Sequence, residues 1–465
     1  MRHELLLIAA ALLVLMVEIF SDPGKKRRLS MFSIILFGAV TIAGFLPSPT
    51  GHLFGGMYLS SGTTLIMKNI LNIGALLVFI QSVTWLKKDE NSEKISEYFL
   101  LLISTLVGMN FMISAGHFLI FYIGIELATI PIAALSAYDR YKNKSAEAGI
   151  KLILSSALSS GILLYGLSMI YGTTGTLYFS EVAVHFSNNS LQILGFIFFF
   201  AGMAFKISII PFHLWTADVY EGSPVNITSY LSVISKGAAV FILIIILFTV
   251  FPVIITTWQK TIFVTSILTM TVGNLFAIRQ KNLKRFLAFS SISQAGYIFL
   301  GLIGGNQTGM ASVIYYILVY IFSNLGAFGV VIAISNATGK ENIDDYNGLY
   351  HTNPKLSLVM ILALFSLAGI PPVAGFFGKF FLFTAAAQEG FYLLVLIAVL
   401  NTIISLYYYL LVVKAMFITK SETPIESFKS DFSTRFALGI CIAGIVVTGF
   451  ASIIFEVIRN LSFGV

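Results

Sequence analysis

Lysine residues placed inside apolar stretches are the feature of this sequence with the clearest chemical potential. A charged side chain at the centre of a bilayer costs a few kcal/mol, about 2.5–3.5 kcal/mol on insertion scales, so such residues are functional candidates by default. The residues within or close to apolar stretches are Lys151, Lys206, Lys236, Lys379 and Lys414. An ammonium group in such a place can bind and release a proton, and this is the chemistry that we consider first.

The depth of each lysine separates a functional interpretation from a structural one. Lys236 lies about eleven residues into its stretch, or about 16 Å along a helix, which is near mid-membrane. Lys206 and Lys379 are also placed deep. Lys414 lies near the end of its stretch, where a long side chain reaches the interface. For Lys151, near the start of a stretch, an interfacial and a functional position remain equally open.

Glu126 is the one acidic residue that we expect deep in the membrane. Opposite charges that face each other in a dry bundle hold one another charged. A lysine whose acidic partner can move away can release its proton and later reload it, so we predict that Glu126 and Lys206 form a switchable pair. His213 follows Lys206 by seven residues and titrates near neutral pH, which suits a relay. A hydrogen-bonded histidine at the interface is the alternative.

Composition determines the class of fold. Hydrophobic residues make up 57% of the 465 residues and charged residues only 11%, against roughly 25% in soluble domains. The apolar stretches are long enough to cross about 30 Å of hydrocarbon. The basic residues lie in short loops and do not form a continuous basic surface for nucleic acid. We therefore expect the chain to lie in a lipid bilayer and not to bind nucleic acid. The single cysteine, Cys441, excludes an intrachain disulfide and a cysteine metal cluster.

We predict an all-α integral membrane protein of about 14 transmembrane helices. The expected spans are 4–21, 30–46, 69–86, 97–115, 117–137, 148–172, 190–214, 225–250, 259–278, 286–304, 310–335, 356–385, 389–415 and 436–458. Loops after odd-numbered helices hold 19 basic residues, and loops after even-numbered helices hold only Lys68 and Lys260. By the positive-inside rule both termini are expected outside the cytoplasm. The first stretch precedes its basic cluster, so it is expected to be a retained helix and not a cleaved signal.

Two of the predicted helices are interrupted. Helix 7 contains Pro211 between Lys206 and His213, and helix 12 contains Pro371 and Pro372 near its middle. Proline removes a backbone donor and clashes with the preceding turn, so each helix should break there. Irregular backbone at membrane depth is tolerated only where it is buried in protein or lines water. Two such breaks in corresponding places of two halves indicate an ion path.

The positions of the breaks predict an inverted repeat. Helix 7 is fourth in the set 4–8, and helix 12 is fourth in the set 9–13. Because each set has five helices, the second set must lie upside down relative to the first. We therefore divide the chain into a three-helix segment, two five-helix repeats and a C-terminal helix. These units cover residues 1–96, 97–251, 252–417 and 418–465.

Several long motifs resemble one family. They are FKISIIPFHLWTADVYEGSP (205–224), NLKRFLAFSSISQAGYIFLGL (282–302), YYILVYIFSNLGAF (315–328), LFSLAGIPPVAGFFGKF (364–380) and NTIISLYYYLLVVKAMF (401–417). The sequence is similar to the antiporter-like membrane subunits of respiratory complex I, and most similar to the NADH-quinone oxidoreductase subunit N family, known in mitochondria as NADH dehydrogenase subunit 2. The resemblance covers residues 97–417.

The resemblance implies roles for particular residues. Glu126 matches the family's helix 5 glutamate and Lys206 the helix 7 lysine with which it pairs. Lys236 matches the lysine that carries the proton along a hydrated central axis, and Lys379 matches the residue leading to the outer half-channel. Many subunit N sequences have a histidine in helix 10, where this chain has Gln294.

The resemblance also implies a setting. The chain is expected to pump protons as a membrane-arm subunit of a bacterial NADH:quinone oxidoreductase, in the plasma (inner) membrane. NADH, FMN, iron–sulfur clusters and quinone are expected in partner subunits, and no cofactor or metal is expected in this chain. The partners would be other membrane-arm subunits, including another antiporter-like subunit.

Other interpretations remain open at this point. A subunit of a multisubunit cation/proton antiporter or of a membrane-bound hydrogenase would share this ancestry, and gene neighbourhood would separate them. A stand-alone solute symporter would need a substrate pocket at mid-membrane. A non-transporting scaffold would leave the deep lysines unexplained unless they are ancestral.

Overall fold

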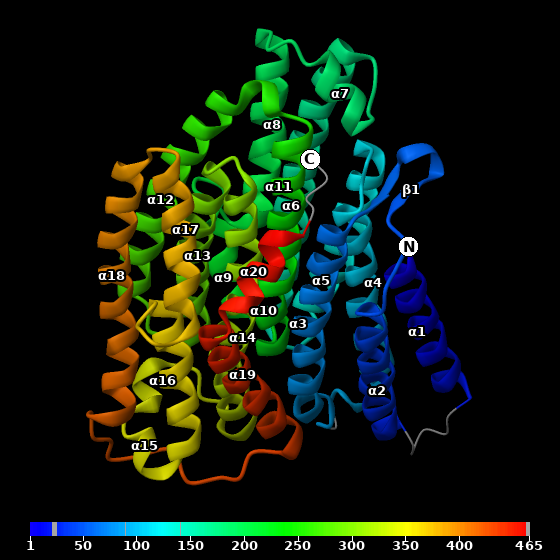
Figure 1. Ribbon diagram of the computed structural model, residues 1–465. Coiled ribbons are helices and arrows are strands. Elements are labelled where there is room, and N and C mark those ends of the chain that lie inside the picture. The colour runs from blue at the N-terminus through cyan, green and yellow to red at the C-terminus, as the bar shows by residue number, and fades with distance from the viewer. Residues whose placement is uncertain (21–25, 89, 140, 462–465) are drawn as a thin grey trace.

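The computed structural model describes residues 1–20, 26–88, 90–139 and 141–461, with the backbone alone for 26, 27 and 452. It is a bundle of helices with one short β-hairpin (Figure 1). Strands β1 (Gly51–Leu53) and β2 (Tyr58–Ser60) pair antiparallel. We call the end of the bundle that carries this hairpin and α7 the outer end, and the end that carries α15 the inner end.

The helices follow one another with short connections. In the first half they are α1 (Arg2–Ile19), α2 (Lys26–Gly44), α3 (Gly62–Leu86), α4 (Ile95–Ile113), α5 (Phe118–Ser136), α6 (Asn143–Thr174), α7 (Phe179–His185), α8 (Ser190–Ile207), α9 (Leu214–Gly222), α10 (Val225–Tyr230) and α11 (Lys236–Thr249). In the second half they are α12 (Ile255–Ile278), α13 (Leu283–Ile303), α14 (Gln307–Thr338), α15 (Leu349–Thr352), α16 (Pro354–Ala368), α17 (Ala374–Gln388), α18 (Tyr392–Phe417), α19 (Phe432–Phe450) and α20 (Ser452–Asn460).

The prediction of an all-helical membrane fold is confirmed. Within the described residues, eleven helices are long and apolar enough to cross a membrane, and α2 and α16 are shorter apolar helices. Every predicted span falls on a helix or on a broken helix of the structure. The predicted span 436–458 differs in form, because the helix ends at Phe450 and a separate short helix, α20, follows Ala451.

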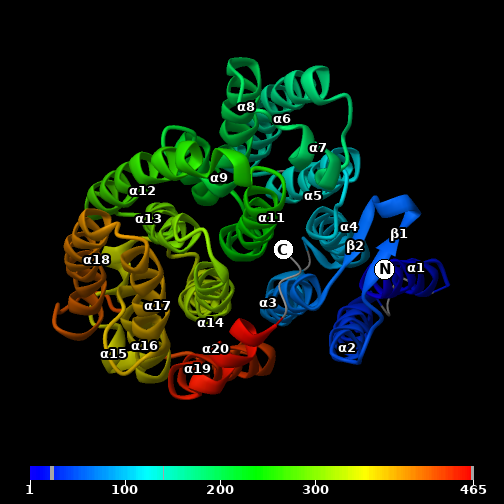
Figure 2. The same ribbon diagram turned by 45° about the horizontal axis from the view of Figure 1, so that its top comes forward.

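The centre of the bundle is formed by α13 and α14, which are almost completely buried. Figure 2 shows α14 inside a ring that includes α3, α11, α13, α17 and α19. Because their neighbours shield them from lipid on all sides, these two helices can carry polar residues, among them Ser291, Gln294 and Asn324, at positions that are 1% exposed or less.

The two predicted breaks are present. Helix α8 ends at Ile207, where Ser208 adopts a left-handed conformation with φ 69°, and α9 begins at Leu214. Helix α16 ends at Ala368, Gly369 has φ 86°, and α17 begins at Ala374. Glycine adopts such a φ at no steric cost, whereas Ser208 must be held there by its surroundings. Its hydroxyl accepts a hydrogen bond from Thr216 Oγ1 at 2.7 Å.

One residue lies in a different place from the one the sequence suggested. We expected Lys68 in an outer loop, but α3 begins six residues before it, and its side chain is 1% exposed. Its ammonium lies 2.6 Å from Glu4 Oε1, and that carboxylate is also fully buried. Glu126 is therefore not the only acidic residue inside the bundle.

Candidate functional site

The three lysines predicted to lie deepest are each held by neutral oxygen atoms. Within the described residues, none of Lys206, Lys236 and Lys379 has a carboxylate within ion-pair distance. They lie on three different helices, α8, α11 and α17. An ammonium without a fixed counter-charge is a group whose protonation can change as nearby charges change.

Lys206 lies in the last turn of α8, where its Nζ donates to Thr129 Oγ1 at 2.6 Å and to Ser156 Oγ at 2.8 Å. The expected direct contact with Glu126 is not present, since Lys206 bonds to these hydroxyls instead. Glu126 lies three residues before Thr129 on the same face of α5, within about one helical turn. Its Oε1 is buried without a hydrogen-bond partner among the described residues. The break after α8 also gives Lys206 the negative end of a helix dipole.

A small cavity lies beside Lys206. Its volume is about 20 Å³, which is room for about one water molecule. Its lining comes from five segments and consists of Met109, Met112, Ile125, Ala128, Thr129, Met203, Lys206, Ser235 and Ala239. Because Ser235 immediately precedes Lys236 in the chain, this cavity lies between two of the deep lysines.

A π-helical turn, Leu231–Ser235, leads directly into Lys236. Such turns are rare in helices and are frequent at functional sites, and nothing in the sequence pattern signalled this one. Lys236 is 3% exposed and its Nζ donates to the carbonyl oxygen and the hydroxyl of Ser291 at 3.1 and 3.0 Å. This contact connects Lys236, in the first half of the protein, to α13 in the second half. We call the series of polar groups that extends from Lys206 through Lys236 to Lys379 the polar chain.

Gln294, one turn along α13 from Ser291, is the centre of the next group. Its Oε1 accepts a hydrogen bond from Tyr316, and its Nε2 donates to Tyr409 Oη at 3.2 Å and to the Leu367 carbonyl at 3.0 Å. All three partners of the Gln294 amide are therefore phenol or carbonyl groups. Gln294 occupies the position where the family resemblance suggested a histidine, and both its amide oxygen and its amide nitrogen have hydrogen-bond partners.

Lys379 completes the series. It is 3% exposed, and its Nζ donates to the Ala368 carbonyl at 3.0 Å and lies 4.4 Å from the centre of the Tyr297 ring. Ala368 is the last residue of α16, so this carbonyl has no partner within its own helix. Gln294 and Lys379 thus donate to consecutive carbonyls, those of Leu367 and Ala368, at the break.

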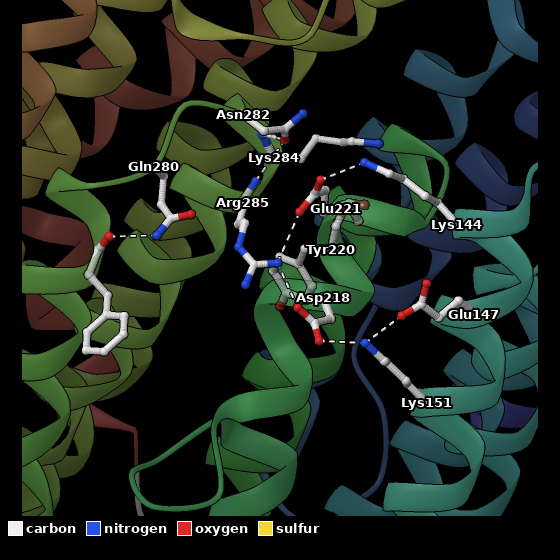
Figure 3. A network of polar contacts seen from close by, with 12 residues as sticks. Lys144, Glu147, Lys151, Asp218, Tyr220, Glu221, Gln280, Asn282, Lys284 and Arg285 are labelled. Carbon is white, nitrogen blue, oxygen red and sulfur yellow. Dashed lines mark hydrogen bonds and ion pairs between the residues drawn. The ribbon is translucent and has the colours of Figure 1, made fainter.

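Lys151 belongs to a different group. Figure 3 shows it in an ion-pair network on α6, α9 and α13, where its Nζ lies 2.7 Å from Asp218. Arg285 lies 2.7 Å from the same carboxylate and 3.1 Å from Glu221, which also pairs with Lys144 at 2.9 Å. Partial burial would raise the pKa of Asp218, but hydrogen bonds from Lys151 and Arg285 hold that pKa below its usual value.

His213 lies after the break, at the start of α9, so it does not share a continuous helix with Lys206. Its ring is 9% exposed and its Nδ1 has no partner among the described residues. The structure brings together Lys206, Lys236, Lys379 and the nearby Glu126, whereas Lys151 and His213 are not part of this polar chain.

The sequence did not indicate Tyr316 and Tyr409, which contact Gln294 from α14 and α18. Tyrosine is common in membrane helices, and only the packing of α13, α14 and α18 brings these hydroxyls together. Ser291 was likewise missed. The one available signal was the presence of Gln294 in an apolar helix.

Comparison with known proteins agrees with this fold. The family described as NADH:quinone oxidoreductase/Mrp antiporter, transmembrane, matches residues 115–405. A chain of the respiratory complex I from Thermus thermophilus with bound aureothin is 26% identical, with 98% of each chain covered and a TM-score of 0.79. A chain of the Mrp complex from Dietzia sp. DQ12-45-1b is 20% identical, with 99% and 98% covered and a TM-score of 0.85, which shows the shared fold. The class is that of antiporter-like membrane subunits of multi-subunit complexes.

Two relatives make the assignment more specific. NADH-quinone oxidoreductase subunit N from Phocaeicola vulgatus is 53% identical over 461 residues, covering 99% of this chain and 98% of the relative. The protein of the same description from Azobacteroides pseudotrichonymphae is 50% identical over 468 residues, covering 100% and 98%. The chain belongs to the family of NADH-quinone oxidoreductase subunit N.

Proposed function

We propose that this chain moves protons through the membrane arm of a bacterial NADH:quinone oxidoreductase by protonation changes of Lys206, Lys236 and Lys379. One observation carries the proposal: three buried lysines on three helices bond only to neutral oxygens, and hydroxyl, amide and carbonyl groups occupy the space between them. Such a series can pass a proton, because each group can give up a hydrogen bond and accept another.

The direction of transfer follows from the ends of the series. A cavity of about 400 Å³ opens at the inner end between the two halves. It is lined by charged residues that include Lys144, Glu221 and Lys284 and also by Ser223 and Asn226. The buried hydroxyl of Ser223, in the lining of this cavity, has no partner among the described residues, and the buried hydroxyl of Tyr220 lies towards Ser291. Protons would enter here, reach Lys236 and leave towards the outer end past Lys379.

In this proposal the chain holds no redox centre. NADH, FMN, iron–sulfur clusters and quinone would bind in partner subunits, and another antiporter-like subunit would be a neighbour. Glu126, with an unpartnered oxygen on α5, would respond to charge changes in that neighbour and thereby alter the protonation of Lys206. The complex would lie in the bacterial plasma membrane with both termini of this chain outside.

The second candidate is a subunit of a multisubunit cation/proton antiporter, which the fold shared with the Mrp complex favours. The two candidates differ in what drives the protons. Proton movement that stops when NADH oxidation stops supports the first, and proton movement driven by a sodium gradient without NADH supports the second.

The test is Lys236→Ala, with Lys236→Arg as the matched control that keeps the charge. We would measure NADH-driven quinone reduction and proton uptake together in inverted membrane vesicles containing the assembled complex. The proposal requires the alanine variant to lose both activities. Unchanged reduction and pumping would make Lys236 structural and overturn the relay.

A further inference from the structure

A second group of buried polar residues lies away from this chain of lysines, near the outer end. Lys68 on α3 donates to Glu4 Oε1 at 2.6 Å, to Ser114 Oγ at 2.6 Å and to Tyr58 Oη at 3.0 Å. Tyr58 in turn donates to Glu4 Oε2 at 3.0 Å. Lys68 is 1% exposed and Glu4 is fully buried, so this is an ion pair removed from solvent.

Two buried asparagines lie one turn further into the bundle. Asn72 follows Lys68 by four residues on α3, and Asn110 precedes Ser114 by four residues on α4. Side chains four residues apart share a helix face, so both amides extend the polar group inward from the ion pair. Both residues are fully buried, and neither amide oxygen nor amide nitrogen of either has a partner among the described residues.

Four unpartnered amide atoms at one depth indicate bound water. Buried polar groups in proteins are nearly always hydrogen-bonded, and a buried water typically makes about three such bonds. Burying an asparagine side chain without hydrogen bonds costs free energy, so a leucine at the same position would make the protein more stable if packing were the only role of the residue. The pair is therefore a candidate site for water between α3 and α4.

The same two helices contact the lysine series. On α4, Met109 and Met112 line the cavity beside Lys206. On α3, Leu71 lies against Gly237, the residue after Lys236, where an added Cβ would be 3.4 Å from the leucine side chain. The asparagines thus lie between the buried ion pair and the elements that carry Lys206 and Lys236.

The ion pair itself lies close to the outer surface. A surface pocket of about 550 Å³ is lined by Leu5, Leu6 and the 48–53 segment, directly beside the helical turn that contains Glu4. Among the described residues, the ionisable groups that face the pair are His3, Tyr58 and the amine of Met1, which is 3.7 Å from Glu4 Oε2. The charged residues of α2 and of α4 lie at the opposite ends of those helices.

We propose that Asn72 and Asn110 bind water and, with Lys68 and Glu4, form a second proton path that joins the Lys206–Lys236 region to the outer end. This rests on the proposed function of those lysines. A proton would pass from the cavity beside Lys206 to water at the asparagines, then to the Glu4 carboxylate while Lys68 keeps its charge, and finally to the outer surface. No bond other than bonds to the proton is made or broken.

The deciding variant is the double change Asn72→Leu and Asn110→Leu, which removes the water site and leaves the ion pair intact. Its matched control is Asn72→Ser with Asn110→Ser, which keeps polar groups and room for water. In the assembled complex, protons taken up per NADH oxidised should fall in the leucine variant and stay near the native value in the serine variant. An unchanged ratio in the leucine variant would overturn the path.

Two further measurements distinguish a failure of the second path from misassembly of the variant and from a failure of the proposed function. If the leucine variant does not assemble, an electron-density map of the native complex at a resolution that shows waters decides the matter, since water between Asn72 and Asn110 is required and its absence contradicts the proposal. If Lys236→Ala leaves pumping intact, the proposed function itself fails. If Lys236→Ala abolishes pumping and the leucine variant does not change the ratio, only the second path is wrong.

Discussion

At the scale of single residues, the deep lysines share one type of environment. Lys206 lies in the last turn of one half-helix and Lys379 binds the last carbonyl of another, so both ammonium groups lie at the negative end of a helix dipole. The dipole favours the charged state without supplying a carboxylate that would fix it. Lys236, after its π-helical turn, relies on Ser291 alone. In the proposed relay, each lysine would therefore be able both to bind a proton and to release it.

Gln294 gives a prediction at this scale. Gln294→Leu removes the contacts to Tyr316, Tyr409 and the Leu367 carbonyl and leaves buried polar groups unpaired, so transfer between Lys236 and Lys379 should fail. Gln294→His restores a donor and an acceptor and should retain pumping. Proton uptake by inverted vesicles, measured beside quinone reduction, checks both variants, and equal pumping by the two would contradict the role of this residue.

A second prediction at the scale of single residues concerns Glu126. Its unpartnered oxygen lies near Lys206 without touching it, so Glu126→Gln should remove an electrostatic coupling and keep the packing. We expect the rate of coupled turnover to fall roughly tenfold, as a coupling energy of about 1.4 kcal/mol would give. Glu126→Asp keeps the charge and should lose less. NADH-driven proton uptake in the two variants is the measurement, and equal losses would argue against an electrostatic role.

At the scale of elements, the break between α16 and α17 depends on close backbone contact. A Cβ added to Gly375 would lie 1.7 Å from the Ser366 carbonyl oxygen, whereas one added to Gly439 on α19 would meet nothing within 4 Å. Gly375→Ala should therefore destabilise the protein by about 1–3 kcal/mol, and Gly439→Ala should be neutral. Thermal denaturation of the detergent-solubilised complex compares them, and similar midpoints would show that α17 can move away freely.

The network on α9 predicts a dependence of stability on pH. The pKa of Asp218 is held below its usual value, so the folded state binds this proton less tightly than the unfolded chain does. Its contribution is present above the unfolded pKa of about 3.9 and is lost as pH falls through the folded pKa. Thermal stability of the native protein should therefore drop more than that of Asp218→Asn between about pH 6 and about pH 2, which are about two units either side of the unfolded value. Parallel curves for the two proteins would contradict this.

The sequence predicts some of these elements well and others not at all. Apolar length and proline predicted the helices and both breaks, because lipid demands intact helices and proline cannot continue one. The π-helical turn has no such marker. Lys68 was expected in an outer loop, and Glu4 falls on the first residue of a predicted span, so neither was expected to be buried. Only the packing of α1 against α4 and the contact of Tyr58 from the β-hairpin bury the pair. Tertiary packing also decides that Lys151 joins the inner network.

At the scale of the whole molecule, the burial of the sole cysteine makes the orientation testable. Cys441 is fully buried, so the native chain should not react with a membrane-impermeant maleimide. We predict that His52→Cys in β1 reacts from outside intact spheroplasts and that Ser421→Cys, in the loop after α18, reacts only in inverted vesicles. The reverse pattern would place the termini in the cytoplasm.

The two broken helices place their lysines well inside the bundle and away from both of its ends, and this has a consequence for how the membrane voltage acts. Moving one elementary charge through the whole membrane against 100 mV costs about 2.3 kcal/mol. In the proposed relay, transfer from Lys206 through Lys236 towards Lys379 would run from helix to helix, largely perpendicular to the electric field, and would therefore involve little of that cost. The voltage would act mainly on the proposed steps that connect the lysines to the inner and outer surfaces. As the membrane becomes charged, entry and exit should therefore slow first, while exchange among the lysines continues.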